Sequence, residues 1–321
     1  MHAIVFSSLG DADVLSAETR QDPRPGAGEI VVENAAIGVN FVDIYQRRGL
    51  YPVALPACVG GEGTGRIAEI GADVSDLKVG DRVVYLSGAG AYAEKTVVAA
   101  PMAARLPDSV AFETAAAIFL KALTAHMLLE IAPMTKGRSG LVHAAAGGVG
   151  TLLVQQASHQ GGDVVAVVGD RAKAEIARMA GARAVIVRKE TPDIAAEVRR
   201  LTNGRGVDAA FDSVGAATFT ASLDSLAPKG IMISYGNASG PVPPVAPLEL
   251  GRRGSLFLTR PSLFHYATQD RLRAMAAEVL ESLLGGVLRP AAPTRFPLDR
   301  AADAHRLLES GASTGSIILI P

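Results

Sequence analysis

A glycine-rich segment at residues 142–150, Val-His-Ala-Ala-Ala-Gly-Gly-Val-Gly, carries the clearest chemical signal in the chain. Gly147 and Gly148 lack a Cβ, so the backbone there can approach a bound group, and Gly150 permits tight packing of a helix on the preceding strand. The N–H groups and positive end of that helix attract an anion such as a pyrophosphate. The predicted phosphate-binding residues of a dinucleotide site are Ala146, Gly147, Gly148 and Val149.

The residues after the next predicted strand decide which dinucleotide fits. An acidic side chain there accepts hydrogen bonds from the 2′-hydroxyl of NAD, whereas a small residue with bases nearby suits the 2′-phosphate of NADP. Gly169 leaves room, and Arg171 and Lys173 supply positive charge. Asp170 permits two interpretations, an N-cap for the following helix or an acceptor for the 2′-hydroxyl. We favour the cap, and therefore NADPH.

Apolar runs alternate with amphipathic stretches around this segment. Between about residues 140 and 235 they follow one another as strand and helix, which is the pattern of a doubly wound parallel sheet. This series favours dinucleotide binding over a simple strand-to-helix turn as the reason for the glycines. The predicted strands are 141–143, 163–168, 184–187, 207–212 and 231–235, and the predicted helices are 149–160, 171–180, 194–202 and 218–226.

The two ends of the chain show a different pattern. Short strand candidates separated by Gly, Pro and Asp indicate antiparallel β-structure in the N-terminal third. A last strand is predicted at 316–320, and it must rejoin the N-terminal sheet or extend the parallel one, because its backbone polar groups need partners. The other candidates are strands at 30–36, 65–70, 82–85 and 91–98 and helices at 269–284 and 299–310.

The composition is that of a soluble globular protein. Of the 321 residues, 49% are hydrophobic and 20% are charged, with a net charge of −1. These values exclude intrinsic disorder and give no reason to expect nucleic acid or an anionic membrane as a partner. No apolar run reaches the ~18 residues of a membrane span, and the N-terminus does not resemble a secretory signal. We expect a cytoplasmic protein.

Several further segments resemble those of a known family. They are 38–45 (Gly-Val-Asn-Phe-Val-Asp-Ile-Tyr), 60–63 (Gly-Gly-Glu-Gly), 80–83 (Gly-Asp-Arg-Val), 212–215 (Asp-Ser-Val-Gly) and 259–262 (Thr-Arg-Pro-Ser). With the glycine loop, they make the chain similar, nearly end to end, to the zinc-independent quinone oxidoreductases of the medium-chain dehydrogenase/reductase superfamily. This resemblance implies an α/β protein with a GroES-like β-rich catalytic domain at 1–123 and 262–321 and a Rossmann domain at 124–261, with the active cleft between them.

Zinc ligands are missing where zinc-dependent members of this superfamily carry them. Those members place a Cys near positions 38 to 40 and a His after the glycine before Glu62, where this chain has Gly38 to Asn40 and Gly61. Cys58 is the only cysteine, so neither of the superfamily's zinc sites can form. We expect no metal. His143, beside the glycine loop, is expected to be a packed or solvent-edge residue and not a ligand.

Without a metal, hydride transfer to an electron-poor quinone depends mainly on holding nicotinamide and acceptor close together. The resemblance implies that Asn40 lies by the nicotinamide ribose and that Tyr45, Arg47 and Tyr51 border the acceptor. Arg47 or a tyrosine hydroxyl would stabilise the developing oxyanion. The alternative is structural, with packing aromatics at Tyr45 and Tyr51 and a solvated basic pair formed by Arg47 and Arg48.

The remaining coenzyme contacts are implied by the resemblance position by position. Lys173 matches the family lysine that binds the 2′-phosphate. Arg188 replaces a tyrosine that is often present, and Gly311 replaces an arginine. Arg188 either adds charge to the phosphate site or is exposed to solvent. The other expected contacts are Thr124, Gly169, Ser213, Tyr235, Gly236, Asn237 and Arg260.

These observations lead to one main hypothesis and two alternatives. The main hypothesis is NADPH-dependent reduction of quinones without a metal. An alkenal or enone double-bond reductase would use the same hydride geometry but usually needs a proton donor for the neighbouring carbon. A non-catalytic, crystallin-like NADPH-binding protein is the third possibility. The resemblance also implies a homodimer, joined along an exposed strand edge of the coenzyme domain.

Overall fold

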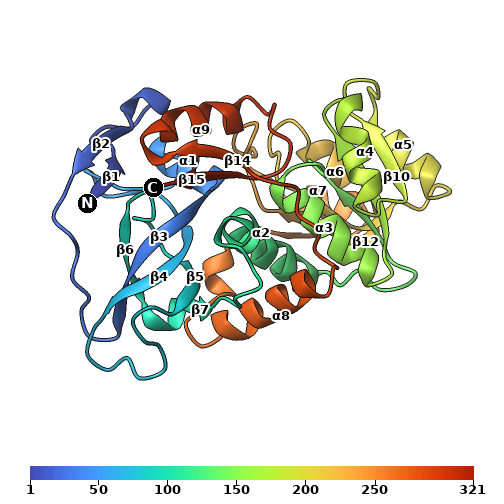
Figure 1. Ribbon diagram of the computed structural model, residues 1–321. Coiled ribbons are helices and arrows are strands. Elements are labelled where there is room, and N and C mark those ends of the chain that lie inside the picture. Colours follow the sequence, from blue (N-terminus) through green and yellow to red (C-terminus); the bar gives the residue numbers. More distant parts are fainter. The chain divides into compact units, whose positions relative to one another are not determined.

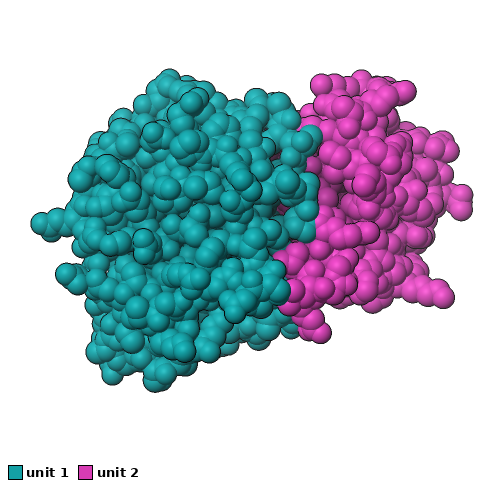
Figure 2. All heavy atoms as spheres, viewed as in Figure 1, with its two compact units in different colours: residues 1–121, 267–280, 290–321 teal, residues 122–266, 281–289 magenta.

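The computed structural model describes all 321 residues of the chain (Figure 1). The chain forms two compact units, which are coloured separately in Figure 2. Unit 1 consists of Met1–Lys121, Ala267–Leu280 and Pro290–Pro321, and unit 2 consists of Ala122–Tyr266 and Glu281–Arg289. Both ends of the chain therefore belong to unit 1.

A six-stranded parallel sheet forms the centre of unit 2. Its strands are β8 (Ser139–Val142), β9 (Asp163–Val168), β10 (Ala184–Val187), β11 (Val207–Asp212), β12 (Leu226–Ser234) and β13 (Phe257–Thr259). They are arranged in the order β10-β9-β8-β11-β12-β13, and every neighbouring pair is parallel. This is the strand order of the dinucleotide-binding Rossmann fold. The order reverses between β8 and β11, so the loops after these strands flank the place where such sheets bind ligands.

Five helices accompany this sheet: α3 (Gly148–His159), α4 (Ala174–Met179), α5 (Ile194–Leu201), α6 (Phe219–Ser225) and α7 (Pro247–Arg252). Apolar side chains from the strands and helices form one buried cluster, to which Leu141, Val165, Val198 and Leu223 contribute. The predicted doubly wound sheet is confirmed, and its strands 163–168, 184–187 and 207–212 have the predicted bounds. The predicted helix at 171–180 differs, because it starts with a 3₁₀ turn at Arg171–Lys173 before α4 begins.

A second, mostly antiparallel sheet forms the centre of unit 1. Its strands are β3 (Glu29–Val39), β4 (Glu62–Ile70), β5 (Arg82–Leu86), β6 (Lys95–Ala99), β7 (Ala103–Arg105), β14 (Thr294–Pro297) and β15 (Ile317–Ile320). The order is β14-β15-β3-β4-β5-β7, and β6 pairs with β3. A separate antiparallel ribbon joins β1 (His2–Val5) and β2 (Ser16–Thr19). The C-terminal strand β15 pairs antiparallel with β3, which confirms the first of its two predicted placements.

Two short helices of unit 1 bring functional candidates into place. Helix α1 (Phe41–Arg47) directly follows β3, and α9 (Ala301–Glu309) packs against β14 and β15 (Figure 1). Two longer helices complete the fold: in the chain, α8 (Leu272–Leu284) precedes β14, and α2 (Phe112–Ile131) follows β7. By length and composition α2 could cross a membrane, but 67% of its apolar window is buried inside the protein. Core helices of soluble proteins share these properties.

The predicted strand at 91–98 is shorter than expected. Strand β6 begins only at Lys95. The preceding residues form a turn in which Ala91 N donates to Gly60 O at 3.2 Å and Tyr92 N donates to Val59 O at 3.0 Å. The Ala91 and Ala93 carbonyls accept from the Asn34 side chain of β3 at 3.3 and 2.8 Å, so a side chain replaces the regular strand ladder here. Tyr92 is fully buried in the core of unit 1.

Candidate active site

The glycine loop joins β8 to α3 through a turn that depends on Gly150. A Cβ at Gly150 would lie 2.3 Å from Ala144 O, far inside the contact distance. Ala144 has a left-handed backbone with a φ of 49°, and Ala145 N donates to Val167 O at 3.1 Å, which fixes the loop against β9. Gly147 is the N-cap of α3 and offers no side chain to the first-turn N–H groups. The loop therefore has the geometry expected of a phosphate site.

The turn after β9 carries the residues predicted to select the coenzyme. A Cβ at Gly169 would meet no atom within 4 Å. Arg188 N donates to Val168 O at 2.9 Å, which places Arg188 beside the end of β9. The Arg188 side chain is exposed, and Lys173, in the 3₁₀ turn, is half-buried. Two bases and an open space thus lie at one end of β9.

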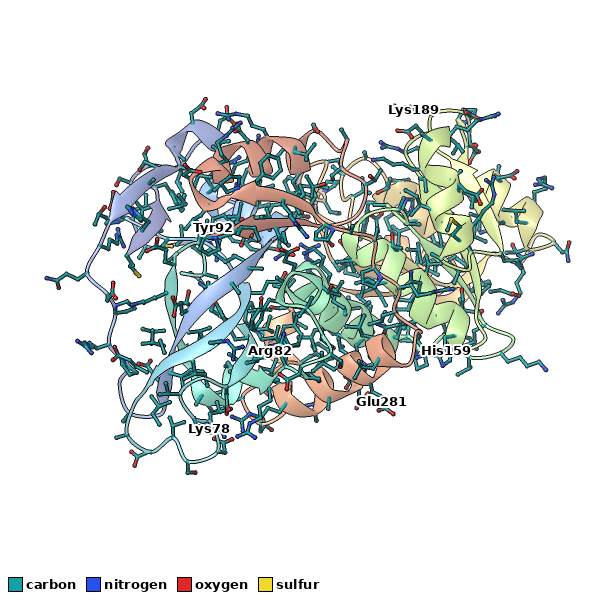
Figure 3. All side chains as sticks on the ribbon, viewed as in Figure 1. Lys78, Arg82, Tyr92, His159, Lys189 and Glu281 are labelled. Atoms are coloured by element: carbon teal, nitrogen blue, oxygen red, sulfur yellow. The ribbon has the colours of Figure 1, made fainter.

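Acidic residues pair with other bases at the same turn. Arg171 Nη2 lies 2.7 Å from Glu190 Oε2. Asp170 occupies the N-cap position of the 3₁₀ turn, but its side chain makes no capping hydrogen bond. Its carboxylate lies 3.9 Å from Nζ of Lys189, which Figure 3 labels on the loop after β10. The predicted capping role of Asp170 is therefore wrong, because its carboxylate faces a lysine instead of the N–H groups of the turn.

The loops after β11, β12 and β13 are in direct contact. A Cβ at Gly236 would lie 2.3 Å from Ser213 O. Arg260 Nη1 donates to the carbonyl oxygens of Ser234 and Gly236, both at 3.0 Å. With the Asn237 amide in the orientation that satisfies both of its polar atoms, its oxygen accepts from Arg260 Nη2 at 3.0 Å and its nitrogen donates to Gly236 O at 2.9 Å. The structure therefore brings together four predicted coenzyme residues: Ser213, Gly236, Asn237 and Arg260.

A buried polar cluster beneath these loops was missed by the sequence analysis. Asp212, the last residue of β11, accepts hydrogen bonds from Thr218 Oγ1 at 2.8 Å and from Ser222 Oγ at 2.7 Å. Ser222 Oγ also lies 3.0 Å from Nε2 of His143. His143 is packed in the interior. Burial lowers the pKa of His143, while the negative charge of Asp212 acts in the opposite direction and raises it. The available signal was an acidic residue at the carboxyl end of a predicted apolar strand.

In unit 1, Asn40 stands at the N-cap of α1 and is held by the fully buried Glu62. Asn40 Nδ2 donates to Glu62 Oε1 at 2.8 Å. The same carboxylate accepts from Leu120 N at 2.7 Å and from Lys121 Nζ at 3.3 Å. Three donors from two elements therefore fix the Glu62 carboxylate, and the carboxylate in turn orients the Asn40 amide.

Tyr45 and Tyr51 pack against each other at the end of α1. Their ring centroids lie 5.3 Å apart in an edge-to-face arrangement, and Phe41 lies 5.9 Å from Tyr45. Tyr51 N donates to Tyr45 O at 3.1 Å, which closes the turn after the helix. Tyr45 is 9% exposed and Tyr51 is half-buried. The packing interpretation of both rings therefore holds, and their contact with an acceptor stays a prediction.

Arg47 has a different environment from the one expected. Its side chain is completely buried, and each guanidinium nitrogen has a partner: Nε donates to Gly10 O at 3.1 Å, Nη1 to His305 Nδ1 at 3.1 Å and Nη2 to Glu309 Oε1 at 2.7 Å. Arg48 is 53% exposed, so the two arginines are not a solvated pair. Because no part of Arg47 is accessible, we remove it from the candidate acceptor site and assign it a structural role.

Other candidates lie in ordinary surroundings. Thr124 is half-buried in α2, and Gly311, after α9, has a φ of 65° that suits glycine. No three His, Cys, Asp or Glu side chains gather as a possible metal site anywhere in the chain. Burial raises the pKa of the Cys58 thiol to about 11, so Cys58 is neutral at pH 7 and is a poor nucleophile or ligand.

Known proteins resemble this chain over its whole length. Residues 26–108 match the family described as the alcohol dehydrogenase GroES-like domain, and residues 148–283 match the family described as zinc-binding dehydrogenase. A quinone oxidoreductase of Pseudomonas aeruginosa is 42% identical over 99% of both chains. A 2-haloacrylate reductase of a Burkholderia species is 37% identical over 99% of this chain and 98% of the relative.

A solved structure adds the three-dimensional comparison. The quinone oxidoreductase of Escherichia coli, crystallised in complex with NADPH, superimposes with a TM-score of 0.97 at 41% identity and 100% coverage of both chains. The GroES-like match in the N-terminal region and the strand order of unit 2 agree with the predicted fold class. The chain therefore belongs to the quinone oxidoreductase family of the medium-chain dehydrogenase/reductase superfamily.

Proposed function

We propose that this protein is an NADPH-dependent quinone oxidoreductase that works without a metal ion. The observation that carries the proposal is the glycine loop, because Gly150 brings the N-terminus of α3 against the end of β8 in a chain whose relative binds NADPH in the same fold. The acceptor is a small, electron-poor molecule of the quinone or enone class.

The residues present fit a dinucleotide. The N-cap of α3 is a glycine without a capping side chain, and the space beside Gly169 is open. We propose that the backbone N–H groups of residues 146–149 bind the pyrophosphate, and that residues 124–261 form the coenzyme-binding domain. The further proposed contacts are Asn40 and Thr124 near the nicotinamide, and Ser213, Tyr235, Gly236, Asn237 and Arg260 along the coenzyme.

The 2′-phosphate would bind at the end of β9. Lys173 and Arg188 supply charge there, and Gly169 supplies space. Arg171 is the third base, and its ion pair with Glu190 reduces the charge that it offers to a phosphate. The proposed coenzyme preference therefore rests mainly on Lys173 and Arg188.

NADPH, when bound, supplies a hydride from C4 of its nicotinamide ring. The oxygen of the reduced acceptor becomes negatively charged and needs a hydrogen-bond donor. We propose the hydroxyl groups of Tyr45 and Tyr51 as donors, because their edge-to-face contact and the Tyr51 N to Tyr45 O bond hold them in place. Asn40, whose amide is oriented by Glu62, would contact the coenzyme near its nicotinamide.

A double-bond reductase is the second candidate. The 37% identical 2-haloacrylate reductase favours it, because the name of that relative describes reduction of an electron-poor alkenoate. Such a reaction adds a hydride to one carbon and a proton to its neighbour, so a donor near the second carbon is required. Tyr45 and Tyr51 are the candidate donors in this case as well.

Coenzyme binding and turnover can be tested together. Lys173→Ala should raise the dissociation constant of NADPH about tenfold and leave that of NADH nearly unchanged, because it removes a charge that pairs only with the 2′-phosphate. Lys136→Ala is the matched control, since Lys136 is exposed in the turn before the amino end of β8, whereas Lys173 follows the carboxyl end of β9. Turnover of quinones but not of 2-alkenals supports the first function, and the reverse supports the second.

Two further outcomes would overturn the proposal. Equal losses of NADPH and NADH in Lys173→Ala would contradict the phosphate assignment. Tight NADPH binding without oxidation by any quinone or alkenal would instead favour the non-catalytic alternative.

A homodimer in the cytoplasm is the assembly that we propose. Strand β13 is an edge of the parallel sheet, and its Phe257 is 61% exposed, with Leu248 of the neighbouring α7 63% exposed. An exposed apolar edge favours pairing with a second copy. Phe257→Lys should therefore shift the mass measured by light scattering from dimer to monomer, and an unchanged mass would exclude this edge.

A further inference from the structure

We propose that His143, Ser222 and Asp212 form a positioning relay that sets the separation of the two loops flanking the point of strand reversal, and so sets the affinity for the dinucleotide. The inference rests on the proposed function, because it assumes that these loops hold the coenzyme. His143 is the first residue after β8, Asp212 is the last residue of β11, and Ser222 lies on α6. The relay therefore connects the end of β8 with the end of β11 through a side chain of α6.

All three side chains are buried, with Asp212 and Ser222 at 0% and His143 at 1% exposure. Ser222 Oγ lies 2.7 Å from Asp212 Oδ2 and 3.0 Å from His143 Nε2. A hydroxyl has one proton, and the shorter bond to the carboxylate uses it. Ser222 Oγ therefore accepts from Nε2–H of His143, so the imidazole is neutral with its proton on Nε2.

The neutral state of His143 agrees with its surroundings. Nδ1 of the ring is buried and has no hydrogen-bond partner. A second proton on the ring would place an N–H group in the interior without an acceptor, which is strongly unfavourable. Burial and the charge of Arg188 both lower the pKa of His143, while Asp212 acts in the opposite direction. The relay is therefore one fixed arrangement of donors and acceptors.

Each end of the relay holds one of the loops. Asp212 Oδ1 accepts from Val214 N at 2.8 Å and from Gly215 N at 3.1 Å, which fixes the turn that contains Ser213. At the other end, His143 directly precedes Ala144, the left-handed residue on which the glycine loop turns. A change at Ser222 would therefore alter both loops, although Ser222 itself is too deeply buried to contact a ligand.

The two loops connected by the relay are proposed to bind the parts of the coenzyme that NADPH and NADH share. Ser213 packs against Gly236, and Ala145 is tied to β9, so a small shift of either loop moves several proposed contacts together. The 2′-phosphate residues at the end of β9 are not part of the relay. Loss of the relay should therefore raise the dissociation constants of NADPH and NADH by the same factor.

Ser222→Ala tests the relay, because it removes both hydrogen bonds and leaves an almost equal volume. We expect the dissociation constants of NADPH and NADH to rise together by about tenfold. Ser225→Ala is the matched control: Ser225 lies on the same helix and is equally buried, but its hydroxyl donates to Ala221 O at 2.7 Å within the helix. The control should change neither dissociation constant by more than about twofold.

Two substitutions of His143 provide an independent arm. Gln places an N–H group near the position of Nε2 and should restore the bond to Ser222, whereas Leu removes it. His143→Gln should therefore bind NADPH almost like the unmodified protein, and His143→Leu should resemble Ser222→Ala. Calorimetric melting of every variant shows whether it is folded.

The possible results are distinguishable. If the unmodified protein binds neither dinucleotide, the proposed function fails. If it binds both and Ser222→Ala lowers the melting temperature without changing affinity, the cluster only stabilises the fold and the relay is disproved. A loss for NADPH alone, or an equal loss in Ser225→Ala, would also disprove it.

Discussion

The guanidinium group of Arg47 lies 3.1 Å from Nδ1 of His305 and so decides which imidazole nitrogen carries the proton. Arginine only donates, so Nδ1 accepts and the proton is on Nε2. Nε2 lies 2.9 Å from the hydroxyl of Tyr92, which donates to Asp43 Oδ2 at 3.1 Å. Figure 3 labels Tyr92. A chain of buried polar groups therefore connects α9 with α1 inside unit 1.

This chain predicts that Arg47 stabilises the fold and does not act on the acceptor. Arg47→Met should lower the free energy of unfolding by about 3 kcal/mol, because it leaves the Gly10 carbonyl and Nδ1 of the buried His305 without a donor and removes one of the two arginines that pair with Glu309. Arg48→Met is the control, since Arg48 is 53% exposed and pairs with the same Glu309; its loss should stay below about 1 kcal/mol.

Urea unfolding and steady-state kinetics separate the two roles of Arg47. The folded Arg47→Met variant should keep its kcat/KM for a quinone within about threefold of the unmodified protein. A variant of normal stability that has lost turnover would return Arg47 to the acceptor site.

Asp43 predicts a pH dependence of stability. It is completely buried, and desolvation raises its pKa from 3.8 to about 7, although Asn40 N and Tyr92 OH donate to its Oδ2. Its Oδ1 has no partner. Between the two pKa values the folded protein binds a proton that the unfolded chain has lost, so stability falls as pH rises from about 4 to about 7.

Asp43→Asn removes this titration and keeps an acceptor for the two donors. Relative to the unmodified protein, the variant should gain about 3 kcal/mol in free energy of unfolding between pH 5 and pH 8. Burial and the charge of Arg47 lower the pKa of His305 to about 3, which has the opposite sign of pH dependence and cancels because both proteins contain His305. Urea unfolding at the two pH values measures the difference, and a gain independent of pH would contradict the raised pKa.

Local patterns in the sequence predict the parallel sheet well, because its strands are short runs rich in Val, Ile and Ala that alternate with amphipathic stretches. Strands 163–168 and 207–212 are recovered with their bounds for this reason. The composition around Ala115–Ala117 and His126 is helical, but the bounds of α2 were not predicted, since its 20 residues show little helical periodicity. Strand β13 is only three residues long, so its pattern is too short to recognise.

Side-chain roles are harder to predict where partners are distant in the chain. Arg47 and Glu309 are separated by 262 residues, so nothing near Arg47 indicates that it is buried. His143 and Ser222 are 79 residues apart. Asp170 shows the reverse problem: a local preference predicted a cap, but Lys189 on another loop draws its carboxylate away. The close-packing role of Gly150 was predicted correctly, because it depends on a backbone contact with Ala144 in the same loop.

Glu190 is expected to limit the preference for NADPH. Its carboxylate holds Arg171 through contacts of 3.1 and 2.7 Å, so in the proposed site Glu190 would compete with a 2′-phosphate for the arginine. Glu190→Gln should strengthen NADPH binding by about threefold and leave NADH unchanged. Glu69→Gln is the control, because Glu69 makes a comparable exposed pair with Arg24 in unit 1. Equal changes for NADPH and NADH would show that Arg171 does not contact the phosphate.

Two glycines of the proposed coenzyme site should respond differently to the same added methyl group. In Gly150→Ala the Cβ would lie 2.3 Å from Ala144 O, which is backbone and cannot move aside alone, so we expect a loss of about 2 kcal/mol in free energy of unfolding. In Gly169→Ala the Cβ would meet nothing within 4 Å, so stability should change by less than about 0.5 kcal/mol.

NADPH affinity should nevertheless fall in both variants. Gly150→Ala disturbs the loop proposed to bind the pyrophosphate, and the methyl group of Gly169→Ala occupies the space proposed for the 2′-phosphate. Thermal melting with and without NADPH measures both effects. If Gly169→Ala melts normally and binds NADPH normally, the phosphate lies elsewhere, because an added methyl group at the proposed position would have obstructed it.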